Sequence, residues 1–94
     1  MKFMIRWEAH PDKRLDVLKT WCDIPAEQRT EMGPGVNFIG RWHNLPEFTG
    51  TLVVETDDIM ALSVYLSHWS PVMDLEVSAV LDDEESVAAG KALL

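Results

Sequence analysis

Two segments in which apolar and polar residues alternate restrict the fold of this chain more than any other feature. In residues 2–8, one side of the alternation carries the apolar side chains of Phe3, Ile5 and Trp7. Residues 72–81 repeat the same two-residue period. Such a period is typical of a β-strand that buries one face and exposes the other. We therefore predict a strand in each of these two segments.

A turn in the middle of the chain predicts two further strands. Gly33-Pro34-Gly35 is suited to end a helical segment, since glycine tolerates a left-handed backbone and proline cannot continue a helix. The strand that follows spans residues 36–43, and residues 49–56 are rich in β-branched side chains. The short connection between the two strands predicts a hairpin. With its turn centred near Glu47, the hairpin pairs His43 with Thr51 and Gly40 with Val54.

Three other segments have the pattern of helices. In residues 11–23 a proline fits the first helical turn and an apolar stripe follows it. Residues 57–70 carry a second stripe, made of Leu62, Tyr65, Leu66 and Trp69. Residues 82–93 open with four acidic residues, which the positive end of a helix dipole favours.

The order of these elements is β-α-β-β-α-β with a C-terminal helix, which predicts a single α+β domain over residues 1–94. Right-handed crossovers then give a ferredoxin-like antiparallel sheet in the spatial order 4-1-3-2, with both main helices on one face. The opposite face stays open. The residues predicted on this open face are Met4, Arg6, Glu8, Ile39, Arg41, His43, Val53, Glu55, Asp74, Glu76 and Val80.

The predicted open face is more apolar than a fully solvated sheet surface needs to be. Its charged residues are mixed with Met4, Ile39, Val53 and Val80. Two such sheets stacked across a two-fold axis would bury these side chains against each other. We therefore expect a homodimer that forms through the open face.

The charge of the chain argues against two classes of partner. With 16 acidic and 8 basic residues, the formal net charge is −8 at pH 7. Nucleic acid and anionic membranes both bind to positively charged surfaces, so we expect neither as a partner. No apolar run approaches the ~20 residues that span a bilayer, and the one after Lys2 is too short for a signal peptide. We expect a cytoplasmic protein.

The sequence contains no motif for a metal or a cofactor. Cys22 is the only cysteine, so neither an internal disulfide nor a thiolate cluster can form. His10, His43 and His68 fall on a loop, a strand and a helix end, without the short spacing of metal ligands. No glycine-rich phosphate loop follows a strand. We therefore expect no metal and no cofactor.

Several short motifs, taken together, resemble one family along the whole chain. They are Met1-Lys2-Phe3-Met4 with Trp7, His10-Pro11 followed by Lys13-Arg14-Leu15, Met32-Gly33-Pro34-Gly35, Gly40-Arg41-Trp42-His43, Trp69, and Asp74-Leu75-Glu76-Val77 before Val80-Leu81-Asp82-Asp83-Glu84-Glu85. With these motifs the chain resembles the domain of unknown function 3303 family of the dimeric α+β barrel superfamily. The resemblance implies a ferredoxin-like fold that dimerises through its sheets. It transfers no catalytic residue, because the superfamily ranges from cofactor-independent monooxygenases, haem-degrading enzymes, isomerases and polyketide cyclases to proteins with no known activity.

Arg41 and His43 are the first candidates for ligand binding. They lie two residues apart on one predicted strand and therefore share a face. A guanidinium fork beside an imidazole can hold a carboxylate or an enolate. The alternative is structural, because on the open face Arg41 would follow Glu55 in a ladder of cross-strand charge pairs that needs no ligand.

A group of aromatic residues forms the second candidate site. Its members are Trp7 and Trp42 on the predicted strands and Trp21, Tyr65 and Trp69 on the predicted helices. We expect the two groups to face each other across a cleft between sheet and helices. His68 lies beside Trp69 at a helix end, where it can act as a base near the mouth of this cleft. The alternative is that the aromatic residues are simply part of the hydrophobic core.

Two classes of function stay open. One is a protein that binds a small aromatic or acidic molecule, and, if it is an enzyme, one similar to cofactor-independent monooxygenases or cyclases. Its candidate catalytic residues are His43 and His68, and its candidate ligand-binding residues are Arg41, Trp42, His43, Tyr65, His68 and Trp69. The other class is a non-catalytic dimeric module. A cavity between sheet and helices separates the two classes, and ligand sites usually begin at ~300 Å³.

Overall fold

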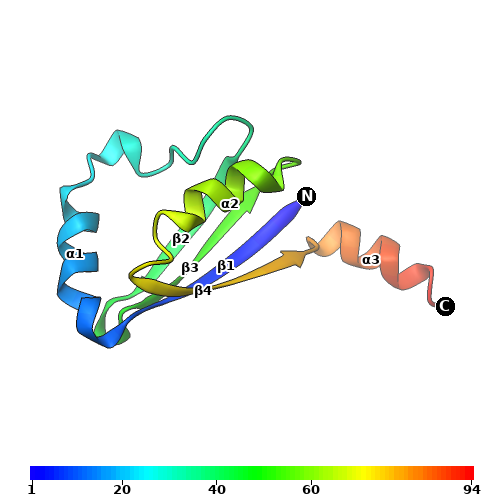
Figure 1. The fold of residues 1–94 in the computed structure, drawn as a ribbon. Helices are drawn as coiled ribbons and strands as arrows, with labels where there is room; N and C mark the ends of the chain where they lie inside the picture. Colours follow the sequence, from blue (N-terminus) through cyan, green and yellow to red (C-terminus); the bar gives the residue numbers. More distant parts are fainter.

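The computed structural model describes residues 1–94, which form a four-stranded antiparallel sheet with three α-helices (Figure 1). The strands are β1 (Lys2–Ala9), β2 (Asn37–Asn44), β3 (Thr49–Glu55) and β4 (Met73–Val80). The helices are α1 (Arg14–Asp23), α2 (Ile59–Ser67) and α3 (Asp83–Lys91), and short 3-10 turns lie at Pro11–Lys13, Ala26–Gln28 and Leu45–Glu47. None of the three α-helices has the length and apolar character needed to cross a membrane.

The strand order β2-β3-β1-β4 confirms the predicted order 4-1-3-2, counted from the other edge of the sheet. β1 is a central strand that pairs with both β3 and β4. Its alternation explains this position, because Phe3 and Ile5 are buried while Met4 and Arg6 are exposed. The α+β architecture and this strand order are compatible with the predicted ferredoxin-like fold.

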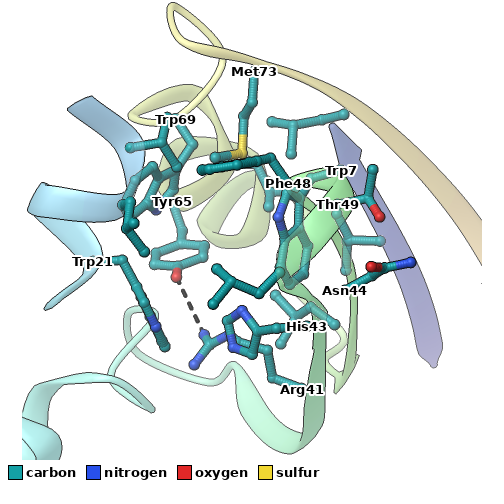
Figure 2. A pocket seen from close by; sticks show the side chains of 17 residues that line it. Trp7, Trp21, Arg41, His43, Asn44, Phe48, Thr49, Tyr65, Trp69 and Met73 are labelled. Carbon is teal, nitrogen blue, oxygen red and sulfur yellow. Dashed lines mark hydrogen bonds between the residues drawn. The ribbon is translucent and has the colours of Figure 1, made fainter. Parts of the chain in front are cut away.

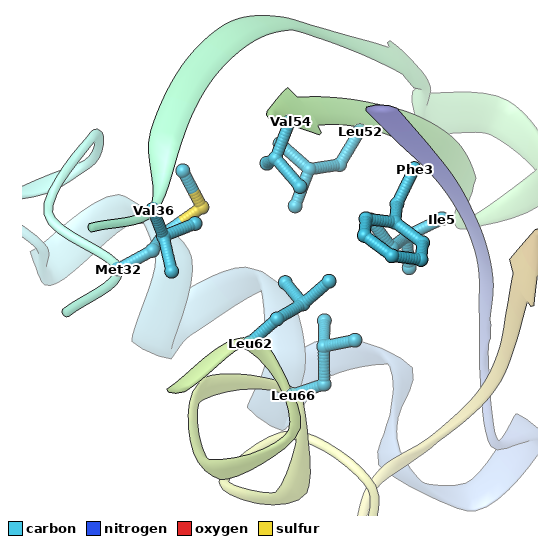
Figure 3. Close-up of a cluster of buried hydrophobic side chains, with 8 residues drawn as sticks. All are labelled: Phe3, Ile5, Met32, Val36, Leu52, Val54, Leu62 and Leu66. Carbon is cyan, nitrogen blue, oxygen red and sulfur yellow. The ribbon is translucent and has the colours of Figure 1, made fainter. Parts of the chain in front are cut away.

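α2 lies over the sheet and completes the hydrophobic core (Figure 3). Its first turn is capped by the carboxylate of Asp58, which accepts a hydrogen bond from the N–H of Ala61 at 3.0 Å. Leu62 and Leu66, one helical turn apart, are both buried. They belong to one cluster with Phe3, Ile5, Met32, Val36, Leu52 and Val54. Because full burial of such a side chain contributes roughly 1.5–3 kcal/mol, this cluster fixes α2 on the sheet.

α1 differs from α2 because none of its residues is buried. Figure 1 shows α1 beside one end of the sheet, not over the strands. The prediction that both main helices cover one face is therefore correct for α2 and wrong for α1. Three apolar side chains of α1, namely Val17, Leu18 and Trp21, line a cavity instead of entering the core.

The hairpin of β2 and β3 has a register that differs from the predicted one. His43 pairs with Gly50, not with Thr51. The turn causes this difference, since Phe48 adopts a left-handed conformation with φ 54° at its end. A β-bulge between Phe38 and Gly40 then shifts the register once more, so that Phe38 pairs with Val54. A shift by one residue moves every side chain of the strand to the other face of the sheet.

The observed register places Arg41 and His43 on the helix side of the sheet and Trp42 on the open face. Arg41 pairs with the buried Leu52, and both lie on the side that α2 covers. Trp42 pairs with Thr51 and is 62% exposed. The predicted facing of these three β2 residues is therefore wrong.

α3 projects away from the sheet and contains no buried residue (Figure 1). Its start follows from a capping box, in which Asp82 accepts from the N–H of Glu85 and Glu85 accepts from the N–H of Asp82. This confirms the helix predicted after residue 82. The Nζ of Lys2 ties the start of α3 to the sheet, because it lies 3.2 Å from Asp82, 3.3 Å from Glu85 and 3.1 Å from Glu55.

Candidate functional site

A cavity of about 90 Å³ opens between α1, α2 and the helix side of the sheet (Figure 2). Hydrophobic residues make up 13 of the 17 that line it. Five of the lining residues are Trp, Tyr or Phe, namely Trp7, Trp21, Phe48, Tyr65 and Trp69. The volume is below the ~300 Å³ at which most ligand sites begin, so by this measure the cavity does not favour the ligand-binding class over the non-catalytic module, and only a small group would fit in it.

Trp7 forms one wall of the cavity because β3 leaves room for its ring. Gly50 pairs with Trp7, and a Cβ atom at Gly50 would lie 2.0 Å from Cζ2 of the indole. His43 pairs with the same Gly50 from the other side. The rings of His43 and Trp7 meet edge to face, with their centroids 5.4 Å apart at an angle of 71°. The glycine thus allows an indole and an imidazole to adjoin at one wall.

Arg41 extends from β2 into the space between α1 and α2. Its Nη1 donates a hydrogen bond to the carbonyl oxygen of Arg29 at 2.9 Å, and its Nη2 donates to the hydroxyl of Tyr65 at 3.4 Å (Figure 2). Its Cζ lies 4.8 Å from the ring centroid of Trp21 and 5.2 Å from that of Phe38, within the ~6 Å range of cation–π contacts. Burial lowers the pKa of Arg41, but a guanidinium stays protonated in a protein.

Arg41 has no carboxylate partner within the protein. The cations in the ion pairs of the chain are the N-terminus and Lys2, and His10 contacts Asp74 through its imidazole. The predicted pairing of Arg41 with Glu55 does not form, because Glu55 lies on the open face and pairs with Lys2. The positive charge of Arg41 is therefore held by a carbonyl, a hydroxyl and two aromatic rings.

His43 is a neutral imidazole at neutral pH. Burial lowers its pKa below the usual value, and the neighbouring charge of Arg41 lowers it further. Its ring lies 5.1 Å from the ring of Trp21 between centroids. A neutral imidazole has one donor and one acceptor nitrogen, so His43 can accept a proton from a molecule bound in the cavity.

A second cation, Arg14, lies close to the cavity without lining it. Its guanidinium stacks on the ring of Phe48, with 5.4 Å between Cζ and the ring centroid. The Nε of Arg14 is buried and has no hydrogen-bond partner. Because Phe48 itself lines the cavity, Arg14 adds positive potential near the site.

Four of the six residues predicted to bind a ligand meet at the cavity, namely Arg41, His43, Tyr65 and Trp69. Trp42 does not reach it, because the indole lies on the open face in a polar hollow with Arg6, Glu8 and Glu76. His68 does not reach it either, because it is exposed at the C-terminal end of α2. The structure therefore leaves His43 as the candidate base.

Sequence reasoning missed the residues of the β2–β3 turn that line the cavity. They are Asn44, Leu45, Phe48 and Thr49. Their place depends on the left-handed backbone of Phe48, which no sequence pattern predicts for this residue type. One signal was available, because Gly50 lies in a strand, where a glycine often marks the close approach of another group.

The side chains of the protein do not form a metal site. No group of three or more His, Cys, Asp or Glu side chains is arranged to hold a metal ion. Cys22 is a free, exposed thiol on α1 and does not line the cavity.

Comparison with known proteins assigns a family to the chain. No curated protein and no solved structure matches it. The family model described as Domain of unknown function (DUF3303) matches residues 1–94, which confirms the family that the sequence motifs indicated. The chain therefore belongs to the DUF3303 family.

Proposed function

We propose that this protein binds a small, largely apolar molecule in the cavity between α1, α2 and the sheet. One observation carries this proposal. α1 turns Val17, Leu18 and Trp21 toward the cavity, yet none of its residues is buried. An occupant of the cavity would complete the packing that α1 lacks, because apolar surface is stabilised when it is removed from water.

If the protein is an enzyme, His43 is the group that can carry its chemistry. The imidazole is neutral at neutral pH and lies beside Arg41 at the wall of the cavity. A base next to a fixed cation can remove a proton from a bound molecule while the cation stabilises the anion that forms. This chemistry fits a cofactor-independent monooxygenase or cyclase, two of the enzyme classes found in the superfamily that the chain resembles.

Binding can be tested by filling the cavity. In a thermal-shift assay with small aromatic compounds, both neutral and acidic, a compound that binds the folded state raises the melting temperature. Val17→Trp places an indole in the cavity and should lower affinity by about tenfold or more. Leu15→Trp is the matched control, because Leu15 lies on the same helix and is 76% exposed. If no compound of either kind shifts the wild-type protein, the proposal is wrong.

We also propose that two copies associate through the open face of the sheet, as in a dimeric α+β barrel. Trp42 is 62% and Met4 is 37% exposed on this face. Light scattering should report about twice the chain mass of 10.7 kDa. Met4→Glu should separate the dimer, whereas Val64→Glu, on the exposed side of α2, should not. A dimer that binds no compound would favour the alternative function, a non-catalytic dimeric module.

A further inference from the structure

The cavity contains one permanent charge, and we infer that its ligand is an organic anion whose carboxylate binds the guanidinium of Arg41. This inference rests on the proposed function and names the class of ligand for the same cavity. The ligand class is a small planar or aromatic carboxylate. Its charged group would lie at Arg41 and its apolar body would lie between the aromatic walls.

The first argument is the unused hydrogen-bonding capacity of Arg41. A guanidinium has five N–H donors. Two of them are used, one by the carbonyl of Arg29 and one by the hydroxyl of Tyr65, which leaves three. Both partners are neutral groups. A carboxylate matches the fork of a guanidinium and forms shorter, stronger hydrogen bonds than neutral acceptors do.

The second argument is the absence of a counter-charge. The chain has 16 acidic residues and a net charge of −8, yet none of the residues that line the cavity is acidic. By contrast, Lys2 is close to three carboxylates at once. A half-buried cation without an anion is unfavourable unless something compensates it. An anionic ligand would provide that compensation.

The aromatic neighbours of Arg41 explain how the protein itself tolerates the charge. Trp21 and Phe38 lie within cation–π distance of the guanidinium. Such contacts hold the group in position but leave its charge in place. The burial that lowers the pKa of His43 also keeps this neighbour neutral, so that it can donate one N–H to a carboxylate without a second positive charge.

The shape of the cavity gives the ligand a direction. Figure 2 shows Arg41 and His43 at one end of the cavity, with Trp69 and Met73 toward the other. A carboxylate at the first end would therefore carry its ring toward Trp69 and Met73. The volume of about 90 Å³ restricts the enclosed part to a small group.

Benzoate and benzamide test the inference, because they have nearly the same shape and only benzoate carries a charge at pH 7. Both can be titrated into ¹⁵N-labelled protein, with the Trp indole and Arg Nε signals as reporters of the cavity. We expect benzoate to bind at least about tenfold more tightly than benzamide. We also expect the benzoate affinity to fall as salt is added, since salt screens a partly exposed charge pair.

Substitutions then show which residue causes the preference for benzoate over benzamide. Arg41→Met keeps the length of the side chain and should reduce benzoate affinity to that of benzamide, while Arg41→Lys should retain part of the preference. Arg6→Met is the matched control, because Arg6 lies on the opposite face of the sheet and should not change either affinity. If Arg41→Met does not fold, the affinities of benzoate and benzamide for the wild-type protein still show whether the cavity prefers an anion.

The outcomes separate this inference from the proposed function. If benzamide perturbs the cavity signals as strongly as benzoate does, the anion inference is wrong and the proposed binding function stands. If Arg6→Met removes the preference for benzoate, the inference is also wrong, since the charge then acts from the open face. If neither compound perturbs the cavity signals, both the inference and the proposed function are overturned.

Discussion

The Nη2 of Arg41 on β2 donates a hydrogen bond to the hydroxyl of Tyr65 on α2, with 3.4 Å between the two atoms. Nη1 of the same guanidinium binds the carbonyl of Arg29, in the segment between α1 and β2. One side chain thus joins the sheet, the core helix and the segment that follows α1. Met32 and Val36 fix the later part of this segment in the core, and Arg41 holds its earlier part at Arg29.

Loss of these hydrogen bonds should have a small effect on stability. Arg41→Met removes both bonds but leaves no carboxylate unpaired, so we expect the free energy of unfolding to fall by only about 1–2 kcal/mol. Tyr65→Phe removes the longer bond alone and should cost about 0.5 kcal/mol. Urea unfolding of both variants and of the double variant measures the loss of free energy of unfolding in each variant and the interaction energy between Arg41 and Tyr65. A loss well above 3 kcal/mol in Arg41→Met would show that a buried group had lost its charge partner.

Gly50 and Gly40 provide a matched pair of substitutions. A Cβ atom at Gly50 would lie 2.0 Å from Cζ2 of Trp7 and 2.6 Å from the backbone oxygen of Trp42. At Gly40 the nearest atom, 2.5 Å away, is the end of the Trp42 ring, which is 62% exposed and free to move. We expect Gly50→Ala to lower the free energy of unfolding by about 1–3 kcal/mol. Gly40→Ala should cost less than about 1 kcal/mol.

The two alanine variants should also differ in their effect on the cavity. Only Gly50→Ala should shift the NMR signal of the Trp7 indole, because Trp7 lines the cavity and packs on Gly50. Equal losses of stability in the two variants would show that the indole of Trp7 moves as easily as that of Trp42.

The strands and their order could be predicted from the sequence. The face of the sheet on which the side chains of β2 lie could not. The alternation in β1 and β4 results from burial of one face, and the sequence displays it directly. In β2 the turn with the left-handed Phe48 shifts the pairing, so that Gly40 pairs with Val53 instead of Val54, and a bulge between Phe38 and Gly40 shifts it again beyond that point. Both features depend on local backbone geometry that no residue pattern in this hairpin specifies.

The contrast between residue patterns, which the sequence displays, and local backbone geometry, which it does not, also explains which candidate residues meet at the cavity. Tyr65 lies on α2 and Trp69 lies in the turn that follows Ser67, the last residue of α2, and both line the cavity. His68 lies in the same turn and is exposed. Trp42 was misplaced together with the part of β2 that follows the bulge. Arg41 and His43 were placed together correctly, since two residues apart on a strand share a face in either register.

His43 should make stability depend on pH. Its pKa is lowered in the folded state by burial and by Arg41, while in the unfolded chain it is close to the ordinary value of about 6.5. As the pH falls below about 6.5 the unfolded chain binds the proton first, so stability should decrease until the folded pKa is passed. At and above neutral pH the stability that comes from the neutral imidazole is fully present.

Two histidine variants measure this pH effect. In His43→Gln the free energy of unfolding should fall less between neutral and mildly acidic pH than it does in the wild type. His68→Gln serves as the control, because His68 lies at the C-terminal end of α2 and does not line the cavity. An unchanged slope in His43→Gln would contradict the shifted pKa. A bound carboxylate should raise the pKa of His43, which an NMR titration with benzoate would detect.

Lys2 should control the order of α3. Its Nζ lies within 3.3 Å of carboxylate oxygens of Glu55, Asp82 and Glu85. Glu55, followed by Asp82 and Glu85, raises the pKa of Lys2, and the pKa of Asp82 is lowered by the N–H of Glu85 and then by Lys2. α3 has no buried residue, so this cluster of charges is the main connection between the helix and the sheet.

Lys2→Met keeps the aliphatic part of the side chain and removes the shared cation, which leaves three carboxylates close together. We expect faster amide hydrogen exchange throughout α3 and little change in the core strands, because only the connection to the helix is lost. Lys19→Met on α1 is the control, since Lys19 forms no ion pair and is exposed.

The difference in α3 exchange rate between Lys2→Met and the wild type should shrink at high salt, where these exposed charges are screened. It should also shrink as the pH falls through the lowered pKa of Asp82, because a protonated carboxyl no longer needs the cation. If α3 exchanges at the same rate in Lys2→Met and in the wild type, the helix is held by contacts outside this cluster, such as those with a second copy of the chain.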